Sequence, residues 1–377
     1  MSERLRVALV APSLGILGGQ AIQADRLLRC WAGDSDVEAW LVPVNPQPPG
    51  WLRHATRVKY ARTVATELTY VPLLRRELRR ADVAHVFSAS YTSFLLAPLP
   101  AVLVARALGV PVILNYRSGE APDHLSRSAV ARRTLASVDR NVVPSPFLQG
   151  VFGAFGIEAA IIPNLVDLDR FTFRLRDPLR PRFLSTRNLE TLYNLPCTLR
   201  AFARIQARYP SATLTLVGRG SQEGVLHQLA ARLGLRGVTF TGAVSPHDIA
   251  PIYADHDIYL QSPNIDNTPT SVIEAYASGL PVISTRAGGV PAILRDDIDG
   301  LLADLDDDEG LAARALRLLE EPGLGRRLTI EARRFSARCT WNSVRPLWLD
   351  AYRSLASLRG RTAGLATRTA PAREGLS

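Results

Sequence analysis

Short runs of apolar and β-branched residues alternate along this 377-residue chain with longer segments in which apolar positions recur at helical spacing. In the first half, the runs typical of strands are LRVALVAPS, VEAWLVPV, ADVAHVFS, VPVILNY, RNVVPS and AAIIPN. Between several of them lie segments of helical period, such as AIQADRLLRCW and PAVLVARALG. Regular alternation of strand and helix predicts a parallel sheet with helices on both faces.

A second series of the same kind begins at RPRFLSTRN. It continues through LRAFARIQARYP, ATLTLVGRG, QEGVLHQLAARLG, GVTFTGAVS, HDIAPIYADH, DIYLQSP, SVIEAYASG and LPVISTR. Beyond Asp304 the pattern becomes wholly helical, as in DDEGLAARALRLLEE and WNSVRPLWLDAYRSLASL. We therefore predict an α/β protein in which two doubly wound Rossmann-like domains face a cleft and are followed by C-terminal helices.

The segment IPNLVDLDRFTFRLRDPLRPR, rich in Pro, Asp and Arg, separates the two series. We predict an N-terminal domain over residues 1–168 and a C-terminal domain over 169–340. A C-terminal helix over 341–359 should return to the N-terminal domain. Residues 360–377 lack an apolar period and are expected to form a flexible tail.

The composition is that of a soluble globular protein, with 47% hydrophobic and 21% charged residues. The longest stretch without Asp, Glu, Lys or Arg, from Val83 to Ala105, contains His85, Pro98 and Pro100, which favours strand, loop and helix over a membrane span. The first apolar run fits a strand better than a signal peptide. Three cysteines without a CxxC pair indicate neither a disulfide framework nor a zinc site, and they fit a reducing cytoplasm.

The formal net charge is +10 and is carried almost entirely by arginine, since Lys59 is the single lysine. The excess is concentrated between Trp51 and Arg80, where eight Lys and Arg stand against two Glu. Basic surfaces attract polyanions such as nucleic acid and anionic membranes. Because the excess lies in one segment, its position is more informative than the total, and we expect no nucleic-acid partner.

Polar residues interrupt the second series in DIYLQSPNIDNTPTSVIEAYASGLPVISTRAGGV, residues 257–290. Two carboxylates, Asp266 and Glu274, stand eight positions apart where a predicted strand gives way to a helix. We expect Pro269 at the first helical position, with Thr268 as its N-cap. Capping and the helix dipole readily explain an isolated pair of acids here. A second glycine-rich turn, AGGVP, follows and favours a ligand site.

The start of that helix predicts a phosphate site. The amides of Thr270 and Ser271 would lie at the helix N-terminus, where free N–H groups and the dipole favour an anion. Glu274 could accept hydrogen bonds from sugar hydroxyls beside that phosphate, and Asp266 could reach another part of the same ligand. Since the carboxyl ends of parallel strands line the usual ligand crevice, we place this ligand between the two domains.

With these segments in view, the sequence resembles family 4 of the retaining glycosyltransferases, also called glycosyl transferases group 1, which have two Rossmann-like domains of the GT-B type. Five segments carry the resemblance in the order that the family has them. They are GGQAIQADRLL, IPNLVDLDRF, LTLVGRGSQEGVLHQLAARLGLRGVTFTGAVS, DNTPTSVIE with ASGLPVI, and AGGVP. The resemblance covers essentially the whole chain to about Leu358.

The resemblance implies a role for each matching residue. Glu274 would hold the ribose hydroxyls, Asp266 would touch the donor sugar where positive charge develops, and Arg187 would contact the diphosphate; these three are the implied catalytic residues. The implied nucleotide-sugar-binding residues are Gly18, Gly19, Arg187, Gly218, Arg219, Gly242, Val244, Thr270, Ser271 and Glu274. A plain strand-to-helix turn is the alternative for the glycine pair near the start, and a surface arginine is the alternative for Arg187.

Three departures from the family pattern stand out. The first acid, usually Glu, is Asp266 here. The lysine that commonly follows the family's arginine is absent from RNLETLYNLP, the segment that begins at Arg187. Tyr193 and Asn194 are left as candidates for the role of that lysine. The histidine often found after the fourth strand is replaced by Arg117, with His124 seven residues later. These four are candidates for donor or acceptor contacts, and for His124 a structural role is an equal alternative.

The resemblance implies a retaining transferase that moves a sugar from a nucleotide-diphosphate sugar to a glycan or lipid-linked acceptor in cell-surface polysaccharide or glycolipid synthesis. The N-terminal domain would bind the acceptor. The departing diphosphate oxygen would take the acceptor's proton, so we expect no cofactor and no essential metal. The rivals are a nucleotide-sugar epimerase or hydrolase on the same fold, and a non-catalytic nucleotide-sugar-binding or polyanion-binding protein.

The basic segment also has an interpretation in this setting. Arg75, Arg76, Arg79 and Arg80 would form one cationic face on a helix, with Trp51, Leu52 and Tyr60 as apolar or aromatic neighbours in the sequence. Such a face suits an anionic membrane surface and a cytoplasmic enzyme bound peripherally at its inner side. The alternative is a solvated helix face.

Overall fold

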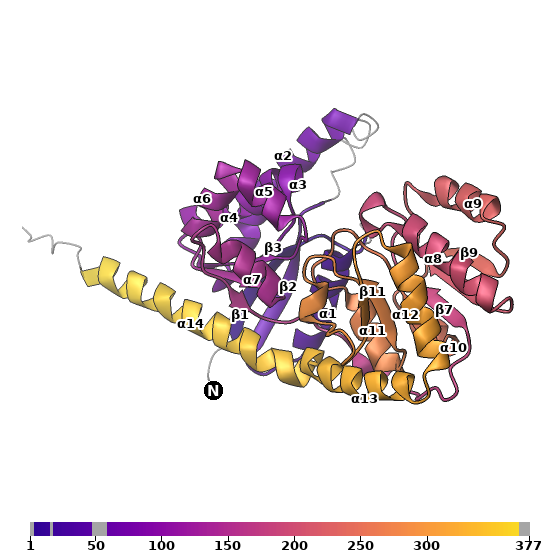
Figure 1. Cartoon of the computed structure of the whole chain (residues 1–377). Helices are drawn as coiled ribbons and strands as arrows, with labels where there is room; N and C mark the ends of the chain where they lie inside the picture. The colour runs from indigo at the N-terminus through magenta and orange to yellow at the C-terminus, as the bar shows by residue number, and fades with distance from the viewer. Residues whose placement is uncertain (1–3, 16–17, 47–58, 369–377) are drawn as a thin grey trace, which may run out of the picture.

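The structure is a computed structural model that describes residues 4–15, 18–46 and 59–368. Within these residues, two sheets of six strands each carry the fold, and their orders are β2-β1-β3-β4-β5-β6 and β12-β11-β10-β7-β8-β9. Every ladder between neighbouring strands is parallel. The prediction of two doubly wound α/β units is therefore confirmed (Figure 1).

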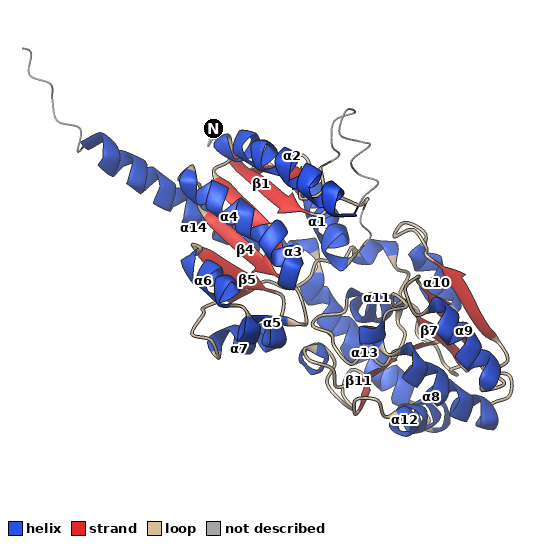
Figure 2. Cartoon of the chain, turned by 90° about the horizontal axis from the view of Figure 1, so that it is seen from above, coloured by secondary structure: helices blue, strands red, loops and turns tan. Residues whose placement is uncertain are grey.

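The first sheet is built from the six runs that the sequence predicts. Its strands are β1 (Leu5–Ala11), β2 (Val37–Pro43), β3 (Val83–Ser88), β4 (Val112–Tyr116), β5 (Arg140–Val143) and β6 (Ala160–Ile161). Its helices are α1 (Gly19–Trp31), α2 (Lys59–Arg79), α3 (Tyr91–Leu96), α4 (Pro98–Ala107), α5 (Ala121–Arg127), α6 (Ala129–Ser137) and α7 (Pro146–Gly153). Every residue of β3 is buried, as expected for a central strand covered on both faces. Figure 2 shows helices α2, α3 and α4 lying over one face of this sheet.

The second sheet repeats this plan. Its strands are β7 (Arg182–Ser185), β8 (Thr213–Val217), β9 (Val238–Gly242), β10 (Ile258–Leu260), β11 (Val282–Thr285) and β12 (Leu301–Ala303). Its helices are α8 (Leu195–Arg208), α9 (Glu223–Arg232), α10 (Ile249–Asp255), α11 (Thr270–Ser278), α12 (Asp308–Glu320) and α13 (Leu324–Ser336). Short 3₁₀ turns lie at η3 (Leu168–Arg170), η4 (Thr191–Tyr193), η5 (Val290–Ala292) and η6 (Ala337–Cys339). The sequence analysis missed β12.

The chain passes from the first sheet to the second between β6 and β7, and the predicted border at residues 168 and 169 falls in this connection. The last helix, α14 (Trp341–Arg368), leaves the second unit and runs back along the first (Figure 1). Trp348, Tyr352 and Leu355 of α14 belong to the same buried cluster as Val7 of β1 and Val83 of β3. The C-terminal helix thus joins the two halves of the molecule.

The helix α14 extends to Arg368 and so includes residues 360–368 of the predicted tail. The reason lies in local propensity. Residues 360–368, GRTAGLATR, carry no apolar period but are rich in good helix formers, and a glycine costs a helix that is already running only about 1 kcal/mol.

Candidate active site

A cavity of about 690 Å³ lies between the two units and is lined by residues from both. The first unit contributes Gly19, Gln20 and Gln23 of α1, Ser90 and Tyr91 after β3, and Arg117 to Glu120 after β4. The second contributes Arg187 after β7 and the segment from Ile265 to Ser271 with Glu274. The lining follows the carboxyl ends of parallel strands, which is where the sequence placed the ligand.

Two helix N-termini meet at this cavity. Gly18 caps α1 with extended backbone, and a Cβ built on Gly18 or Gly19 would meet no described atom within 4 Å, so the space above the first turn is open. On the opposite side, Thr270 and Ser271 are the first residues of α11 and line the same cavity. Free N–H groups and dipoles from both helices therefore favour an anion between them.

The start of α11 differs by one residue from the prediction. Pro269 is the N-cap, with φ −62° and ψ 114°, and the helix begins at Thr270. The carbonyl of Thr268 instead accepts a hydrogen bond of 2.8 Å from the Asn164 side-chain amide, which comes from the connection between the units. This long-range contact holds Thr268 outside the helix, so Thr268 is not its N-cap.

Asp266 and Arg187 form an ion pair in the cavity wall, with 2.5 Å between the Asp266 Oδ2 and Arg187 Nη2 atoms. Arg187 also donates to the Ser271 hydroxyl at 3.1 Å, and its guanidinium lies 3.9 Å from the ring centroid of Tyr193. Burial raises the pKa of Asp266, and the charge of Arg187 opposes this rise. Two of the implied catalytic residues thus contact each other directly.

Glu274 is the third implied catalytic residue, and it pairs with a residue that the sequence analysis did not single out. Arg26 of α1 donates to Glu274 Oε1 at 2.6 Å across the boundary between the units, and the Tyr253 hydroxyl donates to Oε2 at 3.1 Å. Arg26 also donates to the carbonyl of Leu165, which bonds Gln23 as well. The only signal in the sequence is that Gln23 and Arg26 share one face of α1.

Two family models match the chain. The model described as Glycosyltransferase Family 4 matches residues 17–170, and the model described as Glycosyl transferases group 1 matches residues 180–321. The first match falls on the first sheet and its helices and the second on the other sheet, so the two matches account for both walls of the cavity. The chain belongs to this glycosyltransferase family.

A relative known from its sequence is the D-inositol 3-phosphate glycosyltransferase of Rhodococcus jostii, which is 28% identical over 276 residues. The match covers 68% of this chain and 61% of the relative. The chain spans 61% or 62% of the length of this and two other relatives of the same description.

Two solved structures show the same fold. HepE of Anabaena, in complex with UDP and glucose, superposes with a TM-score of 0.72 at 16% identity over 93% of this chain and 100% of its own. Sucrose-phosphate synthase of Thermosynechococcus elongatus gives a TM-score of 0.76 at 18% identity over 94% of this chain and 100% of its own. These neighbours confirm the predicted GT-B fold.

The residues that replace the family's histidine have different surroundings. Arg117 lines the cavity. His124 is 2% exposed, lies outside the described lining, and bonds the Tyr116 hydroxyl through Nδ1 at 2.8 Å. Burial lowers the pKa of His124, and Phe94 and Tyr91 pack against its ring. The structure therefore favours the structural alternative for His124.

The two candidates that follow Arg187 in the sequence, Tyr193 and Asn194, also have different surroundings. Tyr193 lines the cavity beneath the guanidinium of Arg187. Asn194 lies outside the described lining, has φ 44° in the left-handed region before α8, and donates from its side chain to Asn264 and Asp306. Asn194 thus lies in the turn between η4 and α8, and Tyr193 is the one of the two that lines the cavity.

The remaining predicted nucleotide-binding residues lie beside the cavity. Gly218 has φ +147°, and a Cβ there would stand 2.4 Å from the Arg187 carbonyl oxygen, so glycine is needed where β8 passes the Arg187 loop. Gly242 lies against the side chain of Arg219. Val244 lines a second cavity of about 340 Å³, where the loop after β9 faces α1. The structure brings these residues to the same side of the second sheet but not into the main lining.

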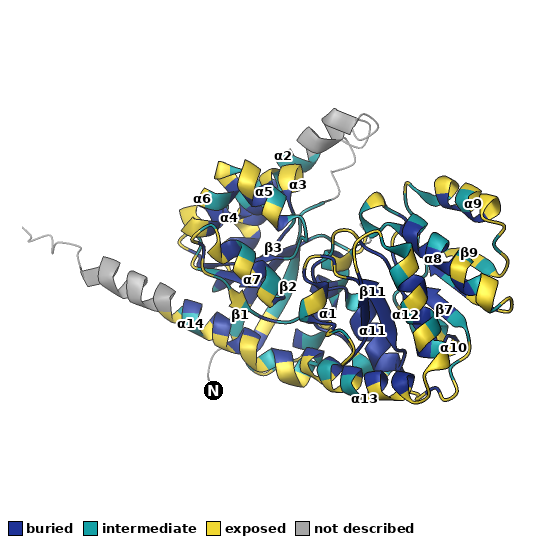
Figure 3. Cartoon of the chain, viewed as in Figure 1, coloured by how far each residue is buried: buried dark blue, intermediate teal, exposed yellow. Residues whose placement is uncertain are grey.

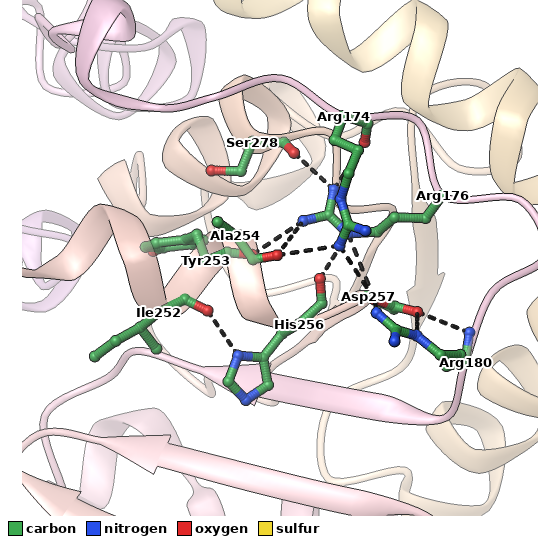
Figure 4. Close-up of polar contacts among 9 residues, drawn as sticks. All are labelled: Arg174, Arg176, Arg180, Ile252, Tyr253, Ala254, His256, Asp257 and Ser278. Carbon is green, nitrogen blue, oxygen red and sulfur yellow. Dashed lines mark hydrogen bonds and ion pairs between the residues drawn. The ribbon is translucent and has the colours of Figure 1, made fainter.

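The helix α11 is buried along almost its whole length and is anchored at its C-terminal end (Figure 3). Arg176 donates to the carbonyls of Ser278 at 2.7 Å, Tyr253 at 3.0 Å and His256 at 2.6 Å (Figure 4). A guanidinium at these carbonyls complements the helix dipoles of α10 and α11. The end of α11 opposite the cavity is thus fixed by one buried arginine.

Two features are absent from the described residues. No group of three or more His, Cys, Asp and Glu is placed to hold a metal ion in that part of the chain. Within the same residues, no helix combines the length and the apolar character needed to cross a bilayer.

Proposed function

We propose that this chain is a retaining, metal-independent glycosyltransferase that moves a sugar from a nucleotide-diphosphate sugar to a glycan or lipid-linked acceptor. One observation carries the proposal: the N-termini of α1 and α11 converge with Arg187 on a cavity between the two units. A diphosphate is the ligand that fits two helix N-termini and a guanidinium. The sugar would then lie beside Asp266, toward the wall formed by the β4 loop.

Relatives and neighbours support the choice of donor and acceptor class. HepE was solved with UDP and glucose, which supports a nucleotide sugar as the donor. The Rhodococcus relative is described by a phosphorylated polyol, D-inositol 3-phosphate, and another relative, from Arabidopsis thaliana, is a sulfoquinovosyl transferase. We infer a role in the synthesis of glycolipid or cell-surface glycan.

The chemistry follows from exchange of partners at Arg187. In the structure, Asp266 neutralises Arg187. An incoming diphosphate offers Arg187 a stronger anionic partner, which leaves the carboxylate of Asp266 free to face the anomeric carbon, where positive charge develops. The departing phosphate oxygen, stabilised by Arg187 and the helix N–H groups, takes the proton of the acceptor hydroxyl on the same face of the sugar.

The experiment that tests the function is incubation of the purified protein with labelled UDP-, GDP- and ADP-sugars, with and without acceptor extracts. Acceptor-dependent sugar transfer is expected. A changed free sugar nucleotide without acceptor would instead indicate an epimerase or hydrolase, and binding without turnover would indicate a non-catalytic protein. The anomeric configuration of the product, read by NMR, tests retention, and assay in EDTA tests metal independence.

The variant Asp266→Asn should lower turnover far more than nucleotide affinity. We expect a loss of about 100-fold in kcat, the order for removing one preorganised charge that stabilises a transition state. The dissociation constant of the bare nucleoside diphosphate should rise by less than about threefold, because the helix N-termini and Arg187 remain and no ion pair has to be exchanged. Steady-state kinetics and calorimetry measure the two quantities, and a loss confined to nucleotide affinity would contradict the sugar-side role.

We also propose that the basic face of α2 meets an anionic membrane. Arg75, Arg76 and Arg79 of α2 and Arg80 directly after it are all exposed, as the sequence predicted. Leu68, 64% exposed, shares the helical row of Arg75 and Arg79. Glu77 pairs with Arg76 and Arg80, so part of the charge is compensated. Trp51 and Leu52 lie outside the described residues, as does the side chain of Tyr60.

The pairing by Glu77 offers a matched comparison. Replacing all four arginines by glutamine should abolish salt-sensitive sedimentation with anionic vesicles and leave nucleotide binding intact. Arg75→Gln with Arg79→Gln should weaken partitioning about thirtyfold, at roughly 1 kcal/mol per basic residue. Arg76→Gln with Arg80→Gln should weaken it less. If the unmodified protein ignores such vesicles at low salt, the membrane role is wrong.

A further inference from the structure

Three arginines line the main cavity or bond one of its two acids, Asp266 and Glu274. They differ in how their positive charge is compensated. Arg187 pairs with Asp266, and Arg26 pairs with Glu274. Within residues 4–15, 18–46 and 59–368, Arg117 forms no ion pair with a carboxylate. The third cation therefore stands in the cleft without a counter-ion from the described chain.

The contacts of Arg117 are with neutral groups. Its Nη1 donates to the side-chain oxygen of Asn115 at 3.3 Å, and its Nη2 donates to the side-chain oxygen of Asn164. The guanidinium also lies 5.6 Å from the ring centroid of Phe87. These contacts fix the direction of the side chain, but none of them supplies negative charge.

An uncompensated cation in a partly buried site is costly, so its retention calls for an explanation. Burial lowers the pKa of Arg117 to about 10, which leaves it charged at neutral pH. The neighbouring His85 does not change this balance, because burial and the charge of Arg117 lower the pKa of His85 to about 3 and keep that ring neutral. An anionic group on a molecule in the cavity would compensate this charge.

The position of Arg117 indicates which part of a ligand it would meet. The loop after β4 touches the Asp266 loop closely, since a Cβ on Gly119 would lie 3.0 Å from the Asp266 carbonyl carbon. Asn164, which accepts from Arg117, donates to the carbonyl of Thr268 in that same loop. Arg117 thus lies on the wall that faces the sugar-side acid, across from the second unit that would carry the nucleotide.

We propose that Arg117 binds an anionic substituent, a carboxylate or a phosphate, of a sugar or polyol held at the reacting end of the cleft. The inference rests on the proposed function, which identifies the cleft as the site of sugar transfer. It extends that function by naming the charge that one of the substrates carries. A guanidinium held by two amide oxygens keeps its remaining N–H groups for a bidentate contact with such an oxyanion. The anion belongs either to the donor sugar or to the acceptor.

The test separates these two sources by calorimetry. In the donor arm, the unmodified protein is titrated with UDP, UDP-glucose and UDP-glucuronate, and with the GDP and ADP series in parallel. In the acceptor arm, protein saturated with the tightest nucleoside diphosphate is titrated with glycerol and glycerol 3-phosphate. In at least one arm, the anionic ligand should bind about tenfold more tightly than its neutral counterpart.

Three variants assign that preference to Arg117. Arg117→Gln should reduce the tenfold ratio to about one while the affinity for bare UDP stays within about twofold, and Arg117→Lys should restore part of the ratio. Asn115→Asp places a carboxylate beside the unchanged Arg117. The new carboxylate can accept a hydrogen bond from Nε2 of His85, whose Nδ1 then accepts one from the Tyr352 hydroxyl. Both ring nitrogens already contact these neighbours, so no side chain has to move. This variant should also lose the preference.

Several results would overturn the proposal. Equal binding of charged and neutral ligands in both arms would do so, as would an unchanged preference in Asn115→Asp. A loss of bare UDP affinity in Arg117→Gln as large as the loss for UDP-glucuronate would make Arg117 a diphosphate ligand instead. If no nucleotide binds at all, the proposed function fails, and free glucuronate and glycerol 3-phosphate then decide: binding that depends on Arg117 sustains the anion site, and no binding rejects it.

Discussion

Replacing Glu274 by alanine should lower kcat/KM about thirtyfold or more, which corresponds to a loss of about 2 kcal/mol or more of transition-state stabilisation. This is the order of magnitude expected for losing a charged hydrogen bond in a closed site. The carboxylate accepts from Arg26 and Tyr253, one bond on each oxygen, and each oxygen keeps a further lone pair for a ribose hydroxyl. Kinetics with the best donor measure the loss. The fold should survive, but the melting temperature should fall because Arg26 is left buried without its partner.

Two comparisons distinguish a ribose contact from a purely structural ion pair. Arg26→Met breaks the same pair from the other side, so it should match Glu274→Ala in lost stability but lose less activity. The nucleotide itself supplies the second comparison. Glu274→Ala should weaken binding of the ordinary nucleoside diphosphate and leave that of its 2′,3′-dideoxy analogue nearly unchanged. An equal loss with both nucleotides would contradict the ribose role.

The pairing of Glu274 shows what the sequence could and could not predict. The acid itself lies in a local pattern, strand then polar loop then helix, that can be recognised within a few residues. Its partner Arg26 lies 248 positions away on another unit, and an arginine on an amphipathic helix carries no local mark of what it faces. Residue types at the site were therefore predictable, whereas the pairs that they form were not.

The same distinction explains the errors in the fold. Strands such as β3 and β11 are long enough to stand out as apolar runs, but the three residues of β12 follow Gly300 without any alternation that could reveal them. Thr268 is a good N-cap by composition, and it fails to cap α11 because Asn164 holds its carbonyl from a distance. Local preference decided most elements, and contacts between distant segments decided their ends.

Replacing Arg176 by methionine should destabilise the second unit by at least about 3 kcal/mol. Three buried carbonyls each lose a charged donor at once, and a hydrogen bond to a charged group contributes about 1.5–3 kcal/mol. Asp257, 1% exposed, would also lose one of its neighbouring cations, with 3.7 Å between Arg176 Nε and Asp257 Oδ1 (Figure 4). The melting temperature should fall by about 6–12 °C, at about 2–4 °C per kcal/mol for a unit of this size.

Arg174 provides the matched control, because it also lies 3.7 Å from Asp257 and donates to the Ala254 carbonyl, but its side chain is 49% exposed. Water can replace its contacts, so Arg174→Met should cost less than about 1 kcal/mol. All five tryptophans lie outside residues 169–340. Circular dichroism should therefore report an earlier transition in Arg176→Met, while tryptophan fluorescence, which reports the first unit and α14, changes less. Equal destabilisation by the two substitutions would show that the buried carbonyl contacts are not what anchors α10 and α11.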